Sequence, residues 1–528
     1  MVNNKRDGGG ANAFSADRRR ALQGIGAMAL AGIPGLAQTV HTSSPQDVNI
    51  PGGEKTYADY PVSDVMRRLS AYMAQARNVA LPAAVLERTK WAVLDTLAAT
   101  VSGSQLPAGR AALAYLRANG GKPVSTVIAA NVLCDPVSTA MINGTMGHAD
   151  ETDDHVTGPW HPGINTVPAA LALGEQFRIS GQHFLRAVAL GYDVGTRVML
   201  ASGVKLNFKV PTNSMGGVFG ATASAACAAG LNEEQCRWAL AYGAQQCSGI
   251  DDFRRDLRHI EKGFMNGGMG ARSGVTSALL VLAGFDGVND ILGGPASFFT
   301  AYEATAKPEL LIDGLGQTFY VTKANFKRWP TGGPVQVMLD SLQALLKRRP
   351  IDPSQVREIV VWFSDPGVTN NGGPPDINVQ HAAALMLTDK RLTFASIHDY
   401  ARLKDPAIVR LRSMTKVVQQ TWTASVPGSA DTPLFEITLA DGTKIRQNYI
   451  ASGYAGAPDT PYTREWVAGK AQSLMSPVLG DRRAAQLVAR VLTLDEAKTV
   501  LDLRPLMQAD ETGGAPKLSN WPMPSALP

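Results

Sequence analysis

The sequence predicts a mainly α protein in which a smaller α+β module is inserted into a large, discontinuous all-helical domain. Three observations lead to this prediction. Helical periodicity fills residues 60–299, strand-like alternation begins near residue 315, and helical periodicity returns after Pro461. Because the chain leaves a helical region and later returns to it, we expect the middle module to be inserted into one discontinuous helical domain.

The first helical part extends over residues 55–315. Apolar residues recur every three or four positions, the period of an amphipathic helix, in five segments: Ser63–Ala76, Ala84–Ser102, Ala108–Asn119, Gly181–Leu200 and Glu233–Gln246. Val218–Ala229 and Ser273–Ala283 are so rich in alanine, glycine and other apolar residues that we expect them to be buried on all sides.

The middle module, residues 316–455, combines strands with short helices. Thr318–Thr322 and Val356–Phe363 have the composition of strands. Phe435–Arg446 alternates apolar and polar residues around Asp441-Gly442, a dipeptide that favours a tight hairpin turn. Helix-like segments at 334–346 and 379–387 lie between these strands. The module is therefore expected to be an α+β lid.

The C-terminal part returns to the helical domain over residues 456–507. The predicted helices are Arg464–Leu474, Arg482–Leu492 and Leu494–Leu501. The tail at 508–528 is rich in proline and glycine and is expected to be loose.

The N-terminal segment, residues 1–40, has the features of a twin-arginine export signal. Arg18-Arg19-Arg20 precedes a short apolar run from Ile25 to Ala37, which ends in small residues. The run is too short and too rich in glycine for a stable membrane span, and no later segment reaches transmembrane length. We therefore expect a periplasmic protein.

Composition excludes several other classes. The 528 residues are 45% hydrophobic and 18% charged with a net charge of +5, and no basic block is interleaved with aromatics, so nucleic acid is not an expected partner. The four cysteines lack the spacing of a zinc site or a disulfide framework. Without a nucleotide-binding motif we expect no nucleotide. The surplus of apolar, alanine-rich helix favours a homodimer.

The most informative stretch is the polar segment 148–163, which holds three of the eight histidines and four carboxylates between two apolar, helix-like segments. Pro159 and Pro162 prevent a continuous helix. One interpretation is an acidic, solvated turn. The other is an active-site loop in which Glu151 and His161 are the acid–base groups.

Several motifs resemble the MmgE/PrpD family. His148-Ala149-Asp150-Glu151-Thr152-Asp153-Asp154-His155, followed by His161-Pro162, is similar to the family's H-A-L-D-F/Y-D-D-T-H loop and its later H-P pair. The resemblance continues through the glycine/alanine-rich stretch 216–226, the stretch 259–274 and Asn325–Pro330, in the expected order. Glu151 replaces the usual aspartate, with Asp150 as its rival, and His155 replaces a threonine.

The resemblance implies a lyase that works without metal or organic cofactor on a small di- or tricarboxylic acid. It assigns catalytic roles to Glu151, His161, Lys209 and Lys262, and substrate-binding roles to His155, Lys327 and Arg328. Lys209 is the nearest candidate for a histidine that family members often carry. This chemistry needs a base beside the substrate and cations for the developing negative charge, and Glu151 is expected to fix the tautomer of His161.

Two alternatives remain open. Asp150, Asp153, Asp154, His155 and His161 offer the ligands of a metal-dependent hydrolase, although their spacing matches no compact metal motif. A non-catalytic periplasmic protein that binds a carboxylate also fits the export signal. The sequence does not distinguish dehydration, decarboxylation and epimerisation.

Overall fold

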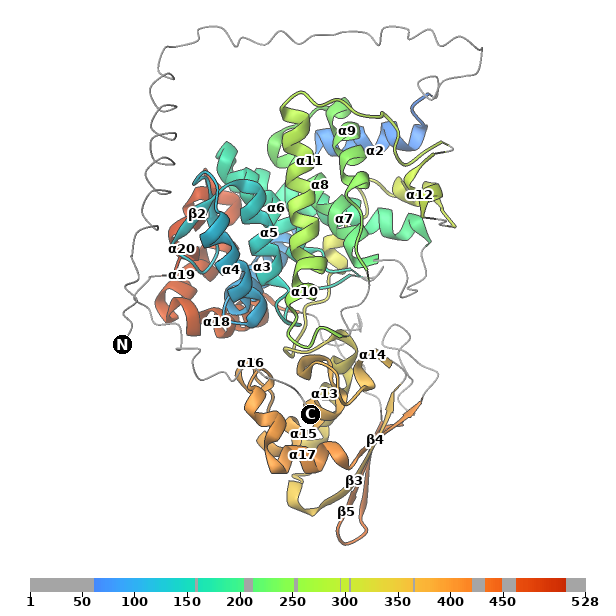
Figure 1. Cartoon of the computed structure of the whole chain (residues 1–528), viewed down its shortest axis with the longest axis vertical. Coiled ribbons are helices and arrows are strands. Elements are labelled where there is room, and N and C mark those ends of the chain that lie inside the picture. The colour runs from blue at the N-terminus through green and yellow to red at the C-terminus, as the bar shows by residue number, and fades with distance from the viewer. Residues whose placement is uncertain are drawn as a thin grey trace, which may run out of the picture. The chain divides into compact units, whose positions relative to one another are not determined.

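The computed structural model describes residues 61–509, except 157–159, 204–211, 251–254, 295, 303–304, 364–365, 420–432 and 449–461. The predicted signal peptide, the C-terminal tail beyond residue 509 and Lys209 lie outside the described residues. The mainly α fold with small sheets that the sequence predicts is confirmed (Figure 1).

The first helical part begins with α2 (Asp64–Gln75), whose first turn is capped by the Ser63 side chain accepting from the Met66 amide. It continues with α3 (Ala83–Gly103), α4 (Pro107–Asn119), the short hairpin β1 (Ser125–Val127) and β2 (Val132–Cys134), α5 (Pro136–Gly147), α6 (Gly163–Phe177), α7 (Gly181–Ser202), α8 (Thr212–Ala229), α9 (Glu233–Gln245), α10 (Ile260–Gly263), the π-helical turn η3 (Phe264–Gly268), α11 (Met269–Leu282) and α12 (Phe298–Ala301).

Helix α8 lies at the centre of the helical core and packs against α6, α7 and α11. Its residues from Ser214 to Ala228 are buried, as their alanine-rich composition predicts. Helix α11 differs, because its last residue, Leu282, is exposed. Among the described helices, none is both long and apolar enough to cross a membrane.

The α+β part is built on a four-stranded sheet in the order β4–β3–β5–β6. Its strands are β3 (Val356–Phe363), β4 (Thr415–Gln419), β5 (Pro433–Leu439) and β6 (Lys444–Asn448). β3 pairs with β4 in parallel and with β5 in antiparallel fashion. Gly442, at φ +83°, makes the predicted turn between β5 and β6, where a residue with a Cβ would be strained.

Helices cover this sheet and complete a second core (Figure 1). They are α13 (Gly333–Arg348), α14 (Pro366–Thr369), α15 (Val379–Asp389), α16 (Phe394–Ile397) and α17 (Pro406–Ser413), with 3₁₀ turns η6 (Pro353–Gln355), η7 (Pro375–Ile377) and η8 (Tyr400–Lys404). Buried apolar residues of the helical core run from Met66 to Phe326 and from Val467 to Met507, and those of the second core from Trp329 to Ile445.

The C-terminal helices complete the first core. α18 (Arg464–Leu479) packs along α3, and α19 (Asp481–Leu492) packs on α18. They are followed by the turns η10 (Leu494–Glu496) and η11 (Val500–Leu503) and by α20 (Arg504–Met507). The predicted α-helix at Leu494–Leu501 is therefore wrong in type, since this stretch forms two 3₁₀ turns.

The predicted strand at Thr318–Thr322 is also wrong. Residues Tyr320–Lys323 form a 3₁₀ turn, η5, and an earlier turn, η4, spans Pro308–Leu311. η5 packs on α3 and α7, and Val321 is buried in the helical core. The Tyr320 amide donates to Asp193 Oδ1 of α7 at 2.7 Å. This segment lies against helices, and none of the described strands pairs with it.

Close packing between α5 and η3 depends on two glycines that face each other. A Cβ at Gly267 would lie 2.2 Å from the Gly144 carbonyl oxygen, and a Cβ at Gly144 would lie 2.7 Å from the Gly267 carbonyl oxygen. Neither backbone can yield without separating the two helical segments.

We therefore expect Gly267→Ala to destabilise the protein by about 1–3 kcal/mol, the usual cost of overpacking. The matched control is Gly469→Ala in α18, where an added Cβ meets nothing within 4 Å. Alanine there should be neutral or stabilise by about 1 kcal/mol, because it is the better helix former. Urea unfolding of both variants measures the difference. Equal stabilities would contradict the role given to this glycine contact.

Candidate active site

The polar segment 148–163 connects α5 to α6 and is not a solvated turn. Residues 148–154 are all at most 4% exposed. His148 caps the end of α5, and Gly163 begins α6. Asp154 joins the end of the loop to the core, because its Oδ1 accepts from the Gly163 amide at 3.1 Å and its Oδ2 lies 2.7 Å from the Tyr192 hydroxyl. Burial, together with nearby Asp95, raises the pKa of Asp154 to about 8.

Glu151 is held between two buried lysines. Its carboxylate forms an ion pair with Lys262 and a second with Lys327, whose Nζ lies 2.7 Å from Oε2. Lys327 Nζ also lies 3.3 Å from Asp153 Oδ1. Burial works to raise the pKa of Glu151, but Lys262 and Lys327 outweigh it and hold the pKa well below its usual range. The two carboxylates therefore stay ionised and balance the two ammonium groups.

His161 is oriented by acceptors on one side of its ring. Its Nδ1 lies 2.9 Å from Asp153 Oδ2 and 2.9 Å from the Asp154 carbonyl oxygen. Because both neighbours accept hydrogen bonds, Nδ1 carries the proton and Nε2 presents a lone pair. Among the described residues, Nε2 has no hydrogen-bond partner. The side chain is 16% exposed, the most of this group.

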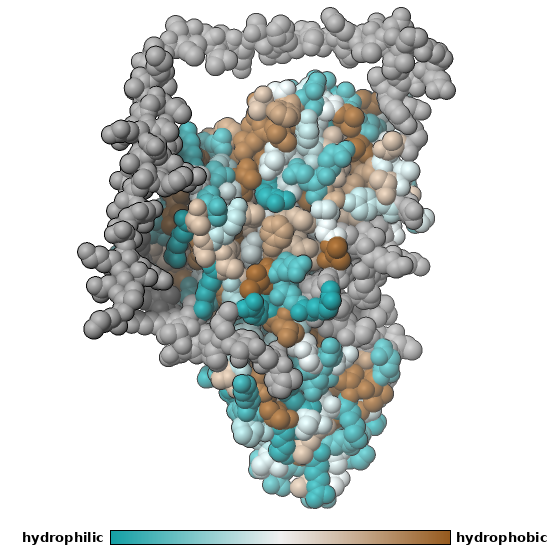
Figure 2. Space-filling model, viewed as in Figure 1, coloured by the Kyte–Doolittle hydropathy of each residue, from teal (hydrophilic) through white to brown (hydrophobic). Residues whose placement is uncertain are grey.

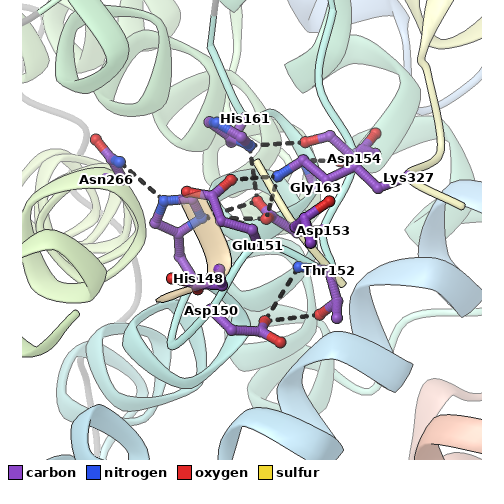
Figure 3. A network of polar contacts seen from close by, with 12 residues as sticks. His148, Asp150, Glu151, Thr152, Asp153, Asp154, His161, Gly163, Asn266 and Lys327 are labelled. Atoms are coloured by element: carbon purple, nitrogen blue, oxygen red, sulfur yellow. Dashed lines mark hydrogen bonds and ion pairs between the residues drawn. The ribbon is translucent and has the colours of Figure 1, made fainter. Parts of the chain in front are cut away.

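The carboxylate that orients His161 is thus Asp153 and not Glu151, which corrects the sequence-based expectation. Glu151 reaches the lysines instead, and its longer side chain contacts both Lys262 and Lys327. Figure 3 shows the contact with Lys327. Burial raises the pKa of Asp153, but His161 and Lys327 more than offset this and hold it well below its usual range. The only sequence signal for this role of Asp153 is its position in the acidic loop, two residues after Glu151.

His148 is the second imidazole on Asp153. Its Nδ1 lies 3.1 Å from both carboxylate oxygens, and its Nε2 lies 2.9 Å from the Asn266 amide nitrogen (Figure 3). Both ring nitrogens are therefore occupied. Burial lowers the pKa of His148 to about 4, although Asp153 partly opposes this. His148 is consequently neutral at physiological pH and supports Asp153 rather than exchanging protons with a substrate.

A short backbone pairing places Lys327 beside the loop. The His155 amide donates to the Asn325 carbonyl at 3.1 Å, and the Asn325 amide donates back at 2.8 Å. Phe326 is fully buried, and the Arg88 guanidinium lies 4.5 Å from its ring centroid. Because the pairing of Asn325 and the burial of Phe326 hold the backbone just before it, Lys327 projects toward Glu151 and Asp153.

Helix α10 and the π-helical turn η3 bring in Lys262 and Asn266. A π-helical turn widens the backbone by one residue and occurs often at functional sites. Here it places Asn266 against His148, while the Asn165 side chain donates to the Asn266 carbonyl at 2.9 Å. The close approach of Gly144 and Gly267 allows this segment to reach the end of α5.

The remaining predicted site residues lie in different places. Asp150 turns away from the lysines and accepts from the amide and hydroxyl of Thr152, which favours Glu151 as the working carboxylate (Figure 3). The ring of His155 lies beside the cluster, and burial lowers its pKa to about 3. Lys209 lies outside the described residues.

Arg328 is not part of the cluster, contrary to the sequence-based expectation. Its side chain is 46% exposed and pairs with Asp340 at 3.2 Å and with Gln343. Lys327 is buried and points inward, whereas Arg328 points to the surface. The sequence alone did not fix which of the two basic residues faces the site.

The geometry does not favour the metal alternative. His148, Asp153 and His161 have ligand atoms within 4.8 Å of one another, close enough to surround an ion. The same atoms, however, already bond to each other, and Lys327 lies 3.3 Å from the Asp153 carboxylate. Two buried ammonium groups repel a cation and attract an anion.

A cavity of about 270 Å³ lies apart from this cluster. It is mostly apolar, it is bordered by α2, α7 and the segment before η5, and its lining includes Tyr72, Leu81, Arg186 and Phe319. None of the cluster residues lines it, so the chemistry of the cluster and this cavity are separate features of the protein.

Two family models cover most of the chain, the MmgE/PrpD N-terminal domain over residues 67–311 and the MmgE/PrpD C-terminal domain over residues 329–494. The chain therefore belongs to the MmgE/PrpD family, as its motifs indicate.

Curated relatives share about a quarter of their residues with this chain. The cis-aconitate decarboxylase-like protein oryM of Aspergillus oryzae is 24% identical over 85% of this chain and 98% of that protein. Cis-aconitate decarboxylase of Aspergillus terreus is 24% identical over 81% of this chain and 92% of that protein. The human cis-aconitate decarboxylase is 25% identical over 63% of this chain and 72% of that protein.

The neighbours Lys327 and Arg328 offer a matched test of the buried ion cluster. Lys327→Met leaves Glu151 and Asp153 with less compensation and should cost about 3–5 kcal/mol of stability, as expected when one member of a buried ion pair is removed. Arg328→Met removes an exposed pair and should change stability by at most about 1 kcal/mol. Urea unfolding at neutral pH measures both. A Lys327 variant as stable as the Arg328 variant would contradict the structure of the cluster.

Proposed function

We propose that this MmgE/PrpD protein is a lyase that acts on a small di- or tricarboxylic acid by moving a proton next to a carboxylate. The observation that carries the proposal is His161 Nε2, an open base whose ring is fixed through Nδ1 by Asp153, beside the buried lysines 262 and 327.

The base comes from the imidazole of His161. Asp153 and the Asp154 carbonyl hold its proton on Nδ1, so that the Nε2 lone pair is available to take a proton from carbon. His148 contacts Asp153 and holds its carboxylate in place, and Asn266 in turn contacts the other nitrogen of the His148 ring. As the proton moves to Nε2, the resulting imidazolium is stabilised by the ionised Asp153.

The two lysines supply the positive charge that this chemistry needs. When a proton leaves carbon, negative charge spreads onto the neighbouring carboxylate, and buried ammonium groups stabilise that charge without first reorganising. Glu151 holds both lysines in place before the substrate arrives. A substrate carboxylate then shares them with Glu151. All of these steps use side chains of the protein, with no organic cofactor.

The relatives supply the first substrate to test. The Aspergillus terreus and human relatives are cis-aconitate decarboxylases, so loss of CO₂ from a tricarboxylate is the first reaction that we propose for this chain. A panel that also contains saturated hydroxy acids separates decarboxylation from dehydration. Substrates are best followed by proton NMR in deuterated water, since exchange at carbon reports the proton transfer itself.

We further propose export by the twin-arginine route and function as a homodimer. Export is supported by Arg18-Arg19-Arg20 and the apolar run after them, and replacing these arginines with lysines should retain the precursor in the cytoplasm.

The dimer is supported by exposed Leu282, Phe285 and Val288, and the face in Figure 2 carries several hydrophobic residues near α9 and α11. Only monomer in light scattering at micromolar concentration would contradict the dimer.

The central test is His161→Ala. We expect turnover to fall about 10²–10⁴-fold, the usual cost of losing a general base, with an unchanged circular dichroism spectrum. Asp153→Asn should lower kcat as well, because the amide can donate to Nδ1 and thereby leave the proton on Nε2. His183→Ala is the control, since that imidazole bonds to the Cys227 carbonyl and to no member of the cluster. Near wild-type turnover in folded His161→Ala would refute the proposal.

A further inference from the structure

A second buried acid–imidazole group lies beside the first. His259 comes directly before α10 and is 3% exposed. Its ring stacks near that of His148, with centroids 6.5 Å apart, and His148 in turn lies 4.6 Å from His161. His259 therefore continues the row of imidazoles away from His161.

The backbone at His259 is held in an unusual conformation. Its φ of +55° lies in the left-handed region, which costs a non-glycine residue free energy. The surrounding structure maintains it, because the His259 amide donates to the Asp256 carbonyl and its own carbonyl accepts from the Gly263 amide. Retained strain of this kind is common at functional sites.

The α+β part supplies a carboxylate to this histidine. Asp376, in the 3₁₀ turn η7, has Oδ1 3.3 Å from His259 Nε2. Burial acts to raise the pKa of Asp376, but His259 and His398 hold it below its usual value. His398 Nε2 lies 4.0 Å from Asp376 Oδ2 and 3.5 Å from Asp150 Oδ2, which links this group back to the loop.

Neither ring nitrogen of His259 meets hydrogen-bond geometry with a described residue; Nε2 faces Asp376 Oδ1 at 3.3 Å, which leaves Nδ1 open. Within the described part of the chain, Nδ1 has no hydrogen-bond partner although it is buried. An unpaired buried polar atom destabilises the folded state, so the fold retains it at a cost in stability. His148, by contrast, uses both of its nitrogens, so His161 and His259 are the two imidazoles of the row with an open nitrogen.

A lyase reaction of the proposed kind needs an acid as well as a base. The carboxylate of Asp153 is shared by His148, His161 and Lys327, and the lysines beside His161 oppose a further positive charge. Asp376 faces His259 at 3.3 Å and His398 only at 4.0 Å. A carboxylate stabilises a proton carried by the imidazole that it faces, and Asp376 faces His259 more closely than it faces His398, so this pair can hold a proton for transfer.

We infer that His259, paired with Asp376, is a second catalytic residue, which gives a proton from Nδ1 after His161 has taken one. This rests on the proposed lyase function and extends it by naming the acid. When a hydroxyl leaves, its C–O bond breaks and the oxygen takes the proton of the imidazolium to leave as water. When CO₂ leaves, the C–C bond breaks and its electron pair stays on the remaining carbon chain. One carbon of that chain takes back the proton that His161 removed and another takes the proton from His259, so the chain gains one proton in all.

The experiment separates the two proton transfers in deuterated water. His259→Asn is the variant of choice, because asparagine tolerates the left-handed region better than most residues. We expect product formation to fall about 10²–10⁴-fold, while His161-dependent exchange of deuterium into the substrate continues. His161→Ala should lose both processes. Asp376→Asn should resemble His259→Asn, and His183→Asn is the control for losing a histidine elsewhere.

A second variant tests the chemistry directly. His259→Gly tolerates the backbone conformation and leaves space for free imidazole, which should restore product formation in proportion to its protonated fraction. If exchange and product formation fall together in His259→Asn and imidazole restores nothing, the role is structural and the inference is wrong. Full turnover in His259→Asn would also overturn it. No exchange by the wild-type protein on any acid tested would instead count against the proposed function.

Discussion

The structure of the site depends on one electrostatic constraint, namely that charges buried away from water must be paired. Glu151, Asp153, Lys262 and Lys327 are each at most 5% exposed. They form a neutral group of two carboxylates and two ammonium ions. An isolated buried charge would cost several kcal/mol, and pairing with good geometry recovers this cost. The position of every element that contributes one of these residues is therefore tied to the positions of the others.

Small residues and short backbone contacts make that pairing possible. The glycine contact between α5 and η3 lets Lys262 and Asn266 approach the end of α5, and the pairing of His155 with Asn325 brings Lys327 to the same point. Both are contacts between backbone segments, so the types of side chain in the sequence do not predict them. The alanine-rich helices around α8 serve the same end, since they let helices pack closely around a polar loop.

Much of the helical framework could be predicted from sequence, because apolar periodicity directly reflects burial of one helix face. The hairpin at Asp441-Gly442 was predictable for the same kind of local reason. The short stretch Thr318–Thr322 has the composition of a strand, but what it packs against decided its structure. The acidic loop was recognisable from its composition and motif. That Asp153 rather than Glu151 contacts His161 could not be predicted, since both are acidic residues of one irregular segment. Asp376 and His398 gave no signal, because the fold alone brings them to the loop.

The location of Lys327 explains why the helical part and the α+β part belong together in this chain. Phe326 is buried in the first core and Trp329 in the second, so Lys327 lies where the chain passes from one to the other. Without it, Glu151 and Asp153 would face Lys262 alone and the buried group would carry a net negative charge. The helical core is therefore electrostatically complete only when the segment that leads into the second core is in place. Because the same lysine is proposed to hold the substrate, the interaction that joins the two cores also prepares the site for an anion.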